Sequence, residues 1–220
     1  KNPPRSRVWT FRIIFYISEG FSGIQVKNLP LYFTTVNVLM DYAKKLEGMT
    51  LKDIMGEITV TDSISRVITK GRVGHLIEEG YFQIKKNSGS EPDISNLGIE
   101  IKTVPLKFNK QKNRLSIKEP LSLNIINYFD EDKTKDLTES SLYKKNKKIL
   151  FIAYIHDKSL PRSEYKIKYV FLWEMNDEVL SEIRPDYKII KDKIRQGKAT
   201  DLHQKYNKYL TTCPKHGGTF

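Results

Sequence analysis

The segment PDISNLGIEIKTVPL, from Pro92 to Leu106, holds the clearest structural pattern in the chain. From Ile99 onward, β-branched residues alternate with charged ones, a period of two that predicts a β-strand. Glu100 and Lys102 are two residues apart, so both side chains leave this strand on one face, about 6.6 Å apart along the chain. The segment therefore predicts a strand that presents a carboxylate beside an ammonium group.

A predicted turn brings a second carboxylate back toward this strand. Asp93 lies seven residues before Glu100, and the intervening Asn96 and Gly98 are typical turn residues. The chain can therefore double back and place the Asp93 carboxylate beside that of Glu100. Together with Lys102, the two carboxylates form a candidate catalytic cluster.

This combination of groups suits the hydrolysis of a phosphodiester. Two carboxylates supply hard oxygen ligands for Mg²⁺, which lowers the pKa of a bound water and neutralises charge on the phosphoryl group. A neighbouring ammonium can orient the water or stabilise the transition state. The spacing alone leaves an alternative open. Asp93 can cap a turn while Glu100 and Lys102 form a solvated ion pair, which contributes under about 1 kcal/mol.

The composition excludes a disordered chain and favours an anionic partner. The 220 residues, one large domain or two small ones, are 39% hydrophobic, enough apolar surface to offset chain entropy. Lys and Arg number 38 against 26 Asp and Glu, which gives a net charge of +12 and a pI near 9.5. A positive charge of this size indicates nucleic acid as the first partner and an anionic membrane as the second.

Cysteine and histidine usage argues against two other kinds of chemistry. Cys213 is the only cysteine, so the chain has no internal disulfide and no cysteine-based zinc site. The four histidines are scattered, without the spacing of a metal site. A single cysteine fits a reducing compartment, and we expect a cytoplasmic protein.

The order of the predicted elements is helical, then β, then helical again. Residues 1–35 form an unassigned arm or added strand with an apolar run at 8–17. We expect helices over 38–48, 50–55 and 73–80, with Thr50 and Asp53 as a capping box. A β meander follows at 99–104, 121–126, 149–155 and 169–173, separated by polar loops at 107–118, 129–141 and 156–168. Helices are expected again at 189–197 and, capped by Thr200, through Leu202, Tyr206 and Leu210. The fold class is therefore α/β, of the mixed α+β kind.

Three basic stretches are candidate contacts to a nucleic-acid backbone. Residues 107–118 hold five cations and no acid, residues 143–148 hold four lysines, and residues 187–220 are also rich in lysine. Such residues supply affinity and salt dependence but no choice of sequence. A basic helix face is also a common solvated surface, so these stretches alone do not decide between the two interpretations.

The spacing of four residues resembles a known nuclease superfamily. Pro92, Asp93, Glu100 and Lys102 reproduce the PD and ExK motifs of the restriction-endonuclease-like nucleases. The segment KGRVGHLIE at 70–78, with the segment around Asp93, resembles the MutH branch and the related GATC-cutting type II restriction endonucleases. LSLNIINY at 121–128 and GKATDLHQKYNKYLTTCPK at 197–215 resemble the restriction enzymes more than MutH. The resemblance covers about residues 36–215.

The resemblance implies roles for individual residues. Asp93, Glu100 and the helix residue Glu78 are the implied metal ligands, and Lys102 acts on the attacking water or the scissile phosphate. Lys145 is the implied additional active-site lysine, with Lys144 one place away. The implied catalytic set is therefore Asp93, Glu100, Lys102, Glu78 and Lys145, and the implied DNA contacts are Lys70, Gly71 and Lys215.

The function implied by the resemblance is Mg²⁺-dependent hydrolysis of double-stranded DNA at 5′-GATC by a type II restriction enzyme. The implied fold is restriction-endonuclease-like, a central mixed β-sheet flanked by helices, with the catalytic domain at 36–220. A further DNA-reading part is expected beyond it, and a dimer or a second related domain when both strands are cut. Two alternatives stay open: a MutH-type nicking endonuclease of mismatch repair, and a DNA-binding domain that has lost catalysis.

Overall fold

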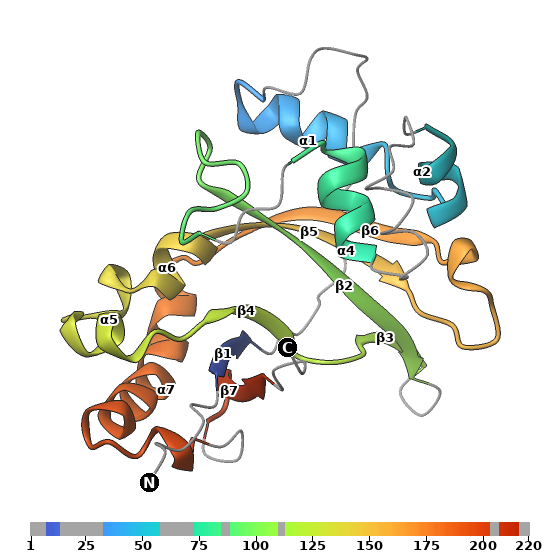
Figure 1. The fold of residues 1–220 in the computed structure, drawn as a ribbon. Helices are drawn as coiled ribbons and strands as arrows, with labels where there is room; N and C mark the ends of the chain where they lie inside the picture. The colour runs from blue at the N-terminus through green and yellow to red at the C-terminus, as the bar shows by residue number, and fades with distance from the viewer. Residues whose placement is uncertain are drawn as a thin grey trace, which may run out of the picture. The chain divides into compact units, whose positions relative to one another are not determined.

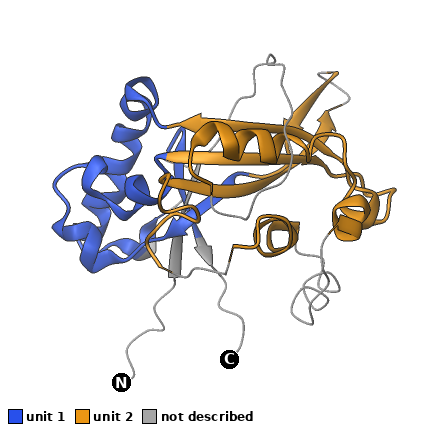
Figure 2. Ribbon diagram, turned by 90° about the horizontal axis from the view of Figure 1, so that it is seen from above, with its two compact units in different colours: residues 1–15, 120–147, 175–220 blue, residues 16–119, 148–174 orange. Residues whose placement is uncertain are grey.

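A computed structural model describes residues 8–13, 33–57, 73–84, 89–109, 113–202 and 207–215 (Figure 1). The chain divides into two compact units, each assembled from separate segments (Figure 2). Unit 1 comprises residues 1–15, 120–147 and 175–220, and unit 2 comprises residues 16–119 and 148–174. Among the described residues, no helix combines the length and the hydrophobicity needed to cross a membrane.

Unit 2 contains a mixed four-stranded sheet with the order β3-β2-β5-β6. These strands are β2 (Ile99–Asn109), β3 (Arg114–Ile117), β5 (Lys148–Ile155) and β6 (Ile167–Glu174). β2 and β5 run parallel, and the other two pairs are antiparallel. The expected mixed sheet is confirmed. The meander is wrong, because parallel neighbours require a long crossover, here through residues 120–147 of unit 1.

Helices cover one face of this sheet. They are α1 (Val36–Lys44), α2 (Leu51–Glu57) and α4 (Val73–His75), which continues as the π-helix η1 (Leu76–Tyr81); a 3-10 turn, η3 (Arg162–Glu164), precedes β6. Leu39, Ile54 and Ile77 from three of these helices are fully buried against Ile101 and Ile152 of the sheet. Burial of each such side chain is worth about 1.5–3 kcal/mol. This core holds η1 over β2.

The capping box predicted for α2 is confirmed. The backbone N–H of Thr50 donates to Asp53 Oδ2 at 2.8 Å, and the N–H of Asp53 donates to Thr50 Oγ1 at 3.1 Å. The Asp53 carboxylate accepts hydrogen bonds from both the backbone N–H and the hydroxyl of Thr50, and these lower its pKa. The two residues fix where α2 begins because they satisfy two backbone donors that the helix leaves open.

The polar loop expected at 107–118 is partly wrong, because the chain forms a hairpin there. β2 continues to Asn109, and β3 pairs with it from Leu106 opposite Ile117 to Asn109 opposite Arg114. Phe108 lies opposite Leu115. The many lysines of this segment concealed the strand pattern, because most of the hairpin side chains are solvent-accessible and therefore need not alternate in hydrophobicity.

Unit 1 contains an antiparallel three-stranded sheet with the order β4-β1-β7. Its strands are β1 (Val8–Ile13), β4 (Leu121–Ile125) and β7 (Leu210–Lys215). The helix expected through Leu210 is wrong, because Leu210 begins β7 and pairs with Ile13 at the other end of the chain. Thr200 lies in a single 3-10 turn, η4 (Ala199–Asp201). At Leu210, pairing with a distant strand overrides the helical spacing, whereas residues 203–206 of the predicted helix, with Tyr206, lie outside the described residues.

Short helices and one long helix complete unit 1. They are α5 (Tyr128–Lys133), the 3-10 turn η2 (Leu137–Glu139), α6 (Ser141–Asn146) and α7 (Asp177–Arg195). α7 begins far before the predicted residue 189 because Asn176 caps it and Pro185 is accommodated inside it. The buried carboxylate of Asp186 then accepts the backbone N–H groups of Lys208, Tyr209 and Leu210, which fixes the entry into β7.

Candidate active site

The turn predicted between Asp93 and Glu100 is present. Ile94 and Ile99 form an isolated antiparallel bridge, with N–H to carbonyl distances of 2.9 and 3.2 Å. Gly98 closes the turn with φ +65°, a backbone conformation that residues other than glycine rarely adopt. The amide of Asn96 donates to the carbonyl of Phe33 at 2.8 Å and ties the turn to the segment before α1.

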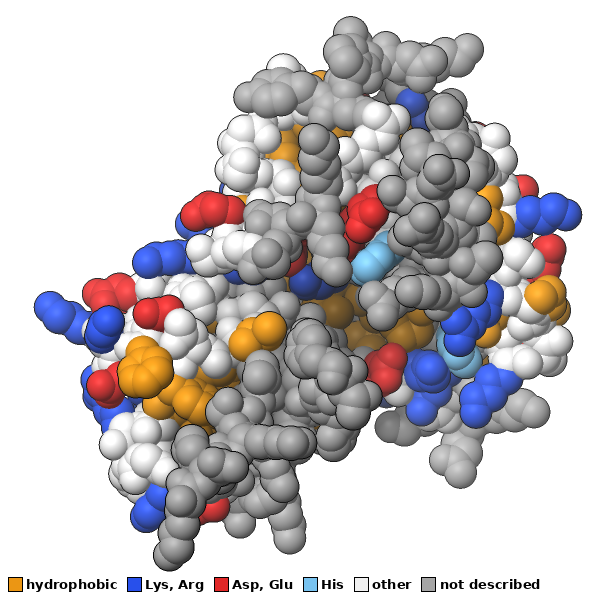
Figure 3. Space-filling view, in the orientation of Figure 1, with side chains coloured by type: hydrophobic (Ala, Val, Ile, Leu, Met, Phe, Trp, Pro, Cys, Tyr) orange, Lys and Arg blue, Asp and Glu red, His pale blue; other side chains and the backbone are white. Residues whose placement is uncertain are grey.

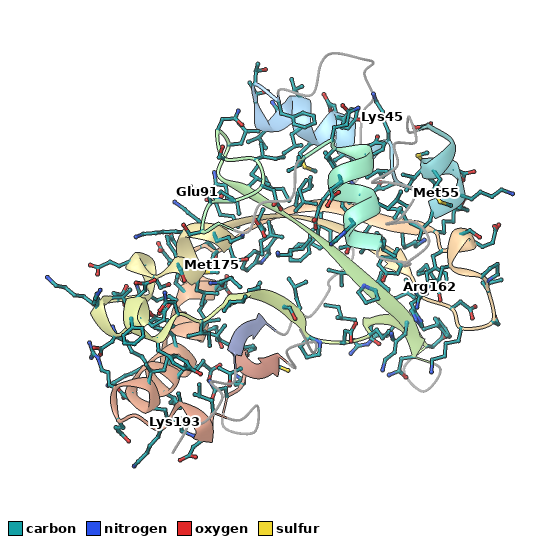
Figure 4. The ribbon with its side chains drawn as sticks, viewed as in Figure 1. Lys45, Met55, Glu91, Arg162, Met175 and Lys193 are labelled. Atoms are coloured by element: carbon teal, nitrogen blue, oxygen red, sulfur yellow. The ribbon has the colours of Figure 1, made fainter. Side chains whose placement is uncertain are left out.

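Two hydrogen bonds hold Asp93 against the start of β2. The backbone N–H of Ile101 donates to Asp93 Oδ2 at 2.9 Å, and the backbone N–H of Asp93 donates to Glu100 Oε2 at 3.2 Å. We call this reciprocal pair the carboxylate brace. β3 pairs only with the second half of β2. Within the described residues, the first half therefore has no strand neighbour on that side, and the Asp93 carboxylate can accept the backbone N–H of Ile101 there. In Figure 4 the labelled Glu91 marks the loop that enters this end of β2.

Lys102 completes the cluster from the same strand. Its Nζ donates to Glu100 Oε1 at 2.6 Å. The side chain of Glu100 is only 3% exposed and that of Lys102 is 18% exposed. The pair is therefore mostly buried, not a solvated ion pair on an open strand face. A buried carboxylate is costly unless it is paired and hydrogen-bonded, and Glu100 meets both conditions.

Glu78 lies in the electrostatic field of these residues. Burial and, next, the charge of Asp93 raise the pKa of its carboxyl group to about 7, while Lys102 opposes the shift. Glu78 and Thr103, which lies on β2, both approach Gly74. A Cβ atom added at Gly74 would lie 3.5 Å from Glu78 Oε1 and 3.4 Å from Thr103 Oγ1. Glu78 belongs to the π-helix η1, a geometry that is frequent at functional sites.

The donors at this end of β2 fit a hard divalent cation. Within the described residues, no group of three or more His, Cys, Asp and Glu side chains converges as a ready-made metal site. Asp93 and Glu100 nevertheless present carboxylate oxygens from adjoining positions, and Glu78 adds a third acid that they influence electrostatically. Carboxylate oxygens, with the remaining positions left to water and phosphate, are the usual ligands of Mg²⁺.

Of the other predicted site residues, the structure describes Lys145 in full, Lys215 only as backbone, and Lys70 and Gly71 not at all. Lys145 lies in α6 of unit 1 and is 9% exposed, and its catalytic role stays a prediction. Lys215 ends β7 opposite Val8, but its side chain is outside the described part of the structure. Lys70 and Gly71 also lie outside the described residues. The structure thus brings together Asp93, Glu100 and Lys102, with Glu78 coupled to them.

Sequence reasoning missed the π-helical form of η1. The apolar spacing at 73–80 predicts an ordinary helix that stops at Gly80, whereas the helix runs to Tyr81 with a wider turn. No local signal marks this change. Tyr42 and the buried Tyr81, whose hydroxyls donate to each other's backbone carbonyls at 3.0 and 3.1 Å, anchor the end of η1 from α1.

A mixed sheet with helices on one face, with Glu100 and Lys102 at the start of one strand and Asp93 in the turn before it, is typical of the class of restriction-endonuclease-like nucleases. The family of the DNA mismatch repair enzyme MutH matches residues 82–186. The chain belongs to the MutH-like branch of this class, a family of DNA endonucleases. Nucleases with this motif generally use a divalent metal ion.

Individual relatives come from two groups of proteins. The chain is 33% identical over 186 residues to the type II restriction enzyme Sau3AI of Staphylococcus aureus. This alignment covers 83% of this chain and 36% of that enzyme. The chain is 25% identical over 186 residues to the mismatch repair protein MutH of Vibrio cholerae, covering 83% of this chain and 79% of that protein. It is 27% identical over 183 residues to the mismatch repair protein MutH of Shewanella woodyi, and this alignment covers 82% of this chain and 75% of that protein. The chain thus spans about a third of Sau3AI.

The raised pKa of Glu78 predicts a pH-dependent stability. A carboxyl group whose pKa is higher in the folded state stabilises the fold fully below its unfolded value near 4.5, and this contribution is lost as the pH rises through about 7. Glu78→Gln removes the charge, so the variant should unfold at a higher temperature than the wild type at pH 8 but not at pH 5.

Thermal unfolding at several pH values, without divalent cations, measures this difference. Glu119→Gln, at an exposed position of the same unit, is the control and should leave the pH profile unchanged. A Glu78→Gln profile that parallels the wild type from pH 5 to pH 8 would show that Glu78 is not in a repulsive acidic environment.

Proposed function

We propose that this chain is the catalytic part of a Mg²⁺-dependent DNA endonuclease that hydrolyses a phosphodiester at 5′-GATC, as a type II restriction enzyme does. The observation that carries the proposal is the carboxylate brace with Lys102 bonded to it, because it gathers two metal ligands and an ammonium at one point. The 33% identity to a type II restriction enzyme supports the same function. The GATC site is implied by the resemblance at 70–78 and around Asp93, and the segments at 121–128 and 197–215 favour the restriction enzymes over MutH.

Each residue of the cluster has a distinct task in this proposal. Asp93 and Glu100 would hold Mg²⁺, and Glu78 would assist from the helix side, at the ion or at its water. The bound ion supplies a water of lowered pKa and offsets charge on the scissile phosphate. Lys102 already points its ammonium at the Glu100 carboxylate, so it is held where it can orient the attacking water or a phosphate oxygen. Lys145 adds a second ammonium.

The proposed substrate is double-stranded DNA. A net charge of +12 favours a polyanion, and Lys70, Gly71 and Lys215 are proposed contacts to it. We assign the catalytic domain to residues 36–220, to which β1 at Val8–Ile13 adds a strand. Cutting both strands requires a second active site, from a second copy or a related domain.

A MutH-type nicking endonuclease is the second candidate. It is favoured by the alignments to MutH, which cover 75–79% of those proteins, whereas the Sau3AI alignment covers 36% of that enzyme. A supercoiled plasmid with GATC sites distinguishes the two. Linear product from the full-length protein alone supports the restriction enzyme, and open circles that accumulate only with a repair partner support the nickase.

Loss of either carboxylate charge should abolish cleavage and leave DNA binding largely intact. Asp93→Asn and Glu100→Gln remove a metal ligand but keep the shape of the side chain, and the basic surface is unchanged. Cleavage with Mg²⁺ and binding with Ca²⁺, which occupies carboxylates but has looser coordination, are measured on one duplex.

The matched control for these variants is Glu91→Gln, an exposed carboxylate two residues before Asp93. It should cut at the wild-type rate. Near wild-type cleavage by Asp93→Asn or Glu100→Gln, or equal wild-type activity in Ca²⁺ and Mg²⁺, would contradict the assignment.

The lysines of the site should differ from those of the surface. Lys102→Met and Lys145→Met are expected to lower the single-turnover rate by orders of magnitude at saturating enzyme, because a positioned ammonium acts on charge that develops in the transition state. Lys118→Met should mainly weaken affinity and lower the salt dependence by about one unit of log-log slope.

Lys144→Met is the matched control for Lys145, since Lys144 is exposed on the same helix. If Lys145→Met loses only affinity while Lys144→Met loses rate, the second active-site lysine is Lys144. If Lys102→Met loses only affinity, the ExK pair has no catalytic role.

A further inference from the structure

The helix that carries Lys145, α6, is too short to fix its own orientation. It has 6 residues, Ser141–Asn146, and isolated helices of fewer than about 12 residues are only marginally stable in water. Ser140 caps it, because its hydroxyl oxygen accepts the backbone N–H of Tyr143 at 3.1 Å. The cap fixes where α6 begins but not which face is buried, so contacts with other elements of unit 1 set the rotation of the helix.

The amide of Asn124, on β4, holds both ends of α6. Its Nδ2 donates to Ser141 Oγ at 3.1 Å, and its Oδ1 accepts a hydrogen bond from Asn146 Nδ2 at 3.3 Å. Ser141 and Asn146 are the first and last residues of the helix, and Asn146 is fully buried. One side chain therefore spans α6 from end to end, and we call these two contacts of Asn124 the amide clasp.

A buried carboxylate holds the first turn of α6 from another element. Glu131, on α5, is 1% exposed. Its Oε1 accepts the hydroxyl of Ser141 at 3.2 Å, and its Oε2 accepts the hydroxyl of Tyr187, on α7, at 2.5 Å. The hydroxyl of Ser141 thus donates to Glu131 and accepts from Asn124. Hydrogen bonds of defined geometry specify one arrangement more sharply than apolar packing does.

The rotation of α6 decides which of its lysines is buried. Residues four apart lie on the same face of a helix, so Lys145 follows Ser141 on the clasped face. Lys145 is 9% exposed, whereas Lys144 and Lys147 are exposed. Figure 3 shows Lys and Arg side chains on the surface at the left of the view, where Figure 1 draws α5 and α6. A rotation by about 100°, one residue of an α-helix, would exchange Lys145 for Lys144.

We propose that Asn124, Ser141 and Glu131 are positioning residues that select Lys145, and not Lys144, as the second ammonium group of the active site. The inference rests on the proposed function, because it takes the catalytic role of Lys145 from there. Asn124 belongs to the segment at 121–128 that resembles the restriction enzymes, so the proposal assigns one residue of that segment a task in catalysis. The three residues act through Lys145 and need not touch DNA.

Single-turnover cleavage at saturating full-length protein, with binding in Ca²⁺ measured on the same duplex, tests the proposal. Asn124→Ala and Ser141→Ala should each lower the cleavage rate about tenfold and leave the affinity unchanged, because a displaced ammonium stabilises the transition state poorly. Ser141→Thr keeps the hydroxyl and should recover the rate that Ser141→Ala loses. Ser122→Ala, the same loss of a hydroxyl at an exposed position of β4, is the matched control and should cut as the wild type does.

A double-mutant cycle separates positioning from a general structural role. In the Lys145→Met background, Asn124→Ala should change the rate by less than about twofold, because the group that it positions is gone. In the Lys144→Met background, it should keep its full effect of about tenfold. An equal loss in both backgrounds overturns the proposal. So does an Asn124→Ala variant that cuts at the wild-type rate or loses only affinity.

Amide hydrogen exchange, measured without DNA, distinguishes failure of this proposal from failure of the proposed function. In Asn124→Ala, the N–H groups of α6 should exchange about tenfold faster than in the wild type, because the helix opens more often once the clasp is lost. Unchanged exchange overturns the proposal whatever the activity. Faster exchange in a protein that cuts no DNA supports the clasp and overturns the nuclease proposal. Wild-type cleavage by Lys145→Met overturns the selection of a catalytic lysine and leaves the site at Asp93 and Glu100 standing.

Discussion

The carboxylate brace between Asp93 and the start of β2 is the interaction on which the candidate site depends. One N–H of the strand is satisfied by the Asp93 carboxylate, and the N–H of Asp93 is satisfied by Glu100, so backbone and site side chains fix each other. The left-handed Gly98 closes the turn that makes this possible, and η1 is held over the same strand by the buried helical layer. This arrangement fixes the positions of the two carboxylates that are proposed to bind the metal ion.

The same arrangement concentrates negative charge. Glu100 is buried, Glu78 has a raised pKa because of burial and neighbouring acids, and Lys102 offsets part of this repulsion. Such a cluster destabilises the fold by itself, as active sites often do, and the divalent cation proposed for this site would relieve the repulsion. Stability and function are therefore opposed at this end of β2. The fold tolerates the cost because the apolar core on the other side of the strand is fully packed.

Local signals predicted the arrangement of the candidate site, and distant pairings limited what could be predicted of the fold. The spacing of Asp93, Glu100 and Lys102, with the turn residues between them, is contained in ten residues, so the alternation and the turn chemistry were sufficient. The capping box of α2 is local as well. The parallel pairing of β2 with β5 and the place of β1 between β4 and β7 join residues far apart in the sequence, and nothing local marks them. Pro185 concealed the first half of α7, and the helical spacing before Leu210 concealed β7, because tertiary pairing overrode local propensity.

Binding of Mn²⁺, followed by electron paramagnetic resonance in the absence of DNA, tests the central claim most directly. If the brace builds a divalent cation site, the wild type should show saturable binding in the micromolar to millimolar range, and Gly98→Val, which removes no ligand but strains the turn, should weaken it about tenfold or more. Circular dichroism confirms that the variant is folded. Unchanged Mn²⁺ affinity in a folded Gly98→Val protein would contradict the claim that the turn holds the two carboxylates in place for the metal.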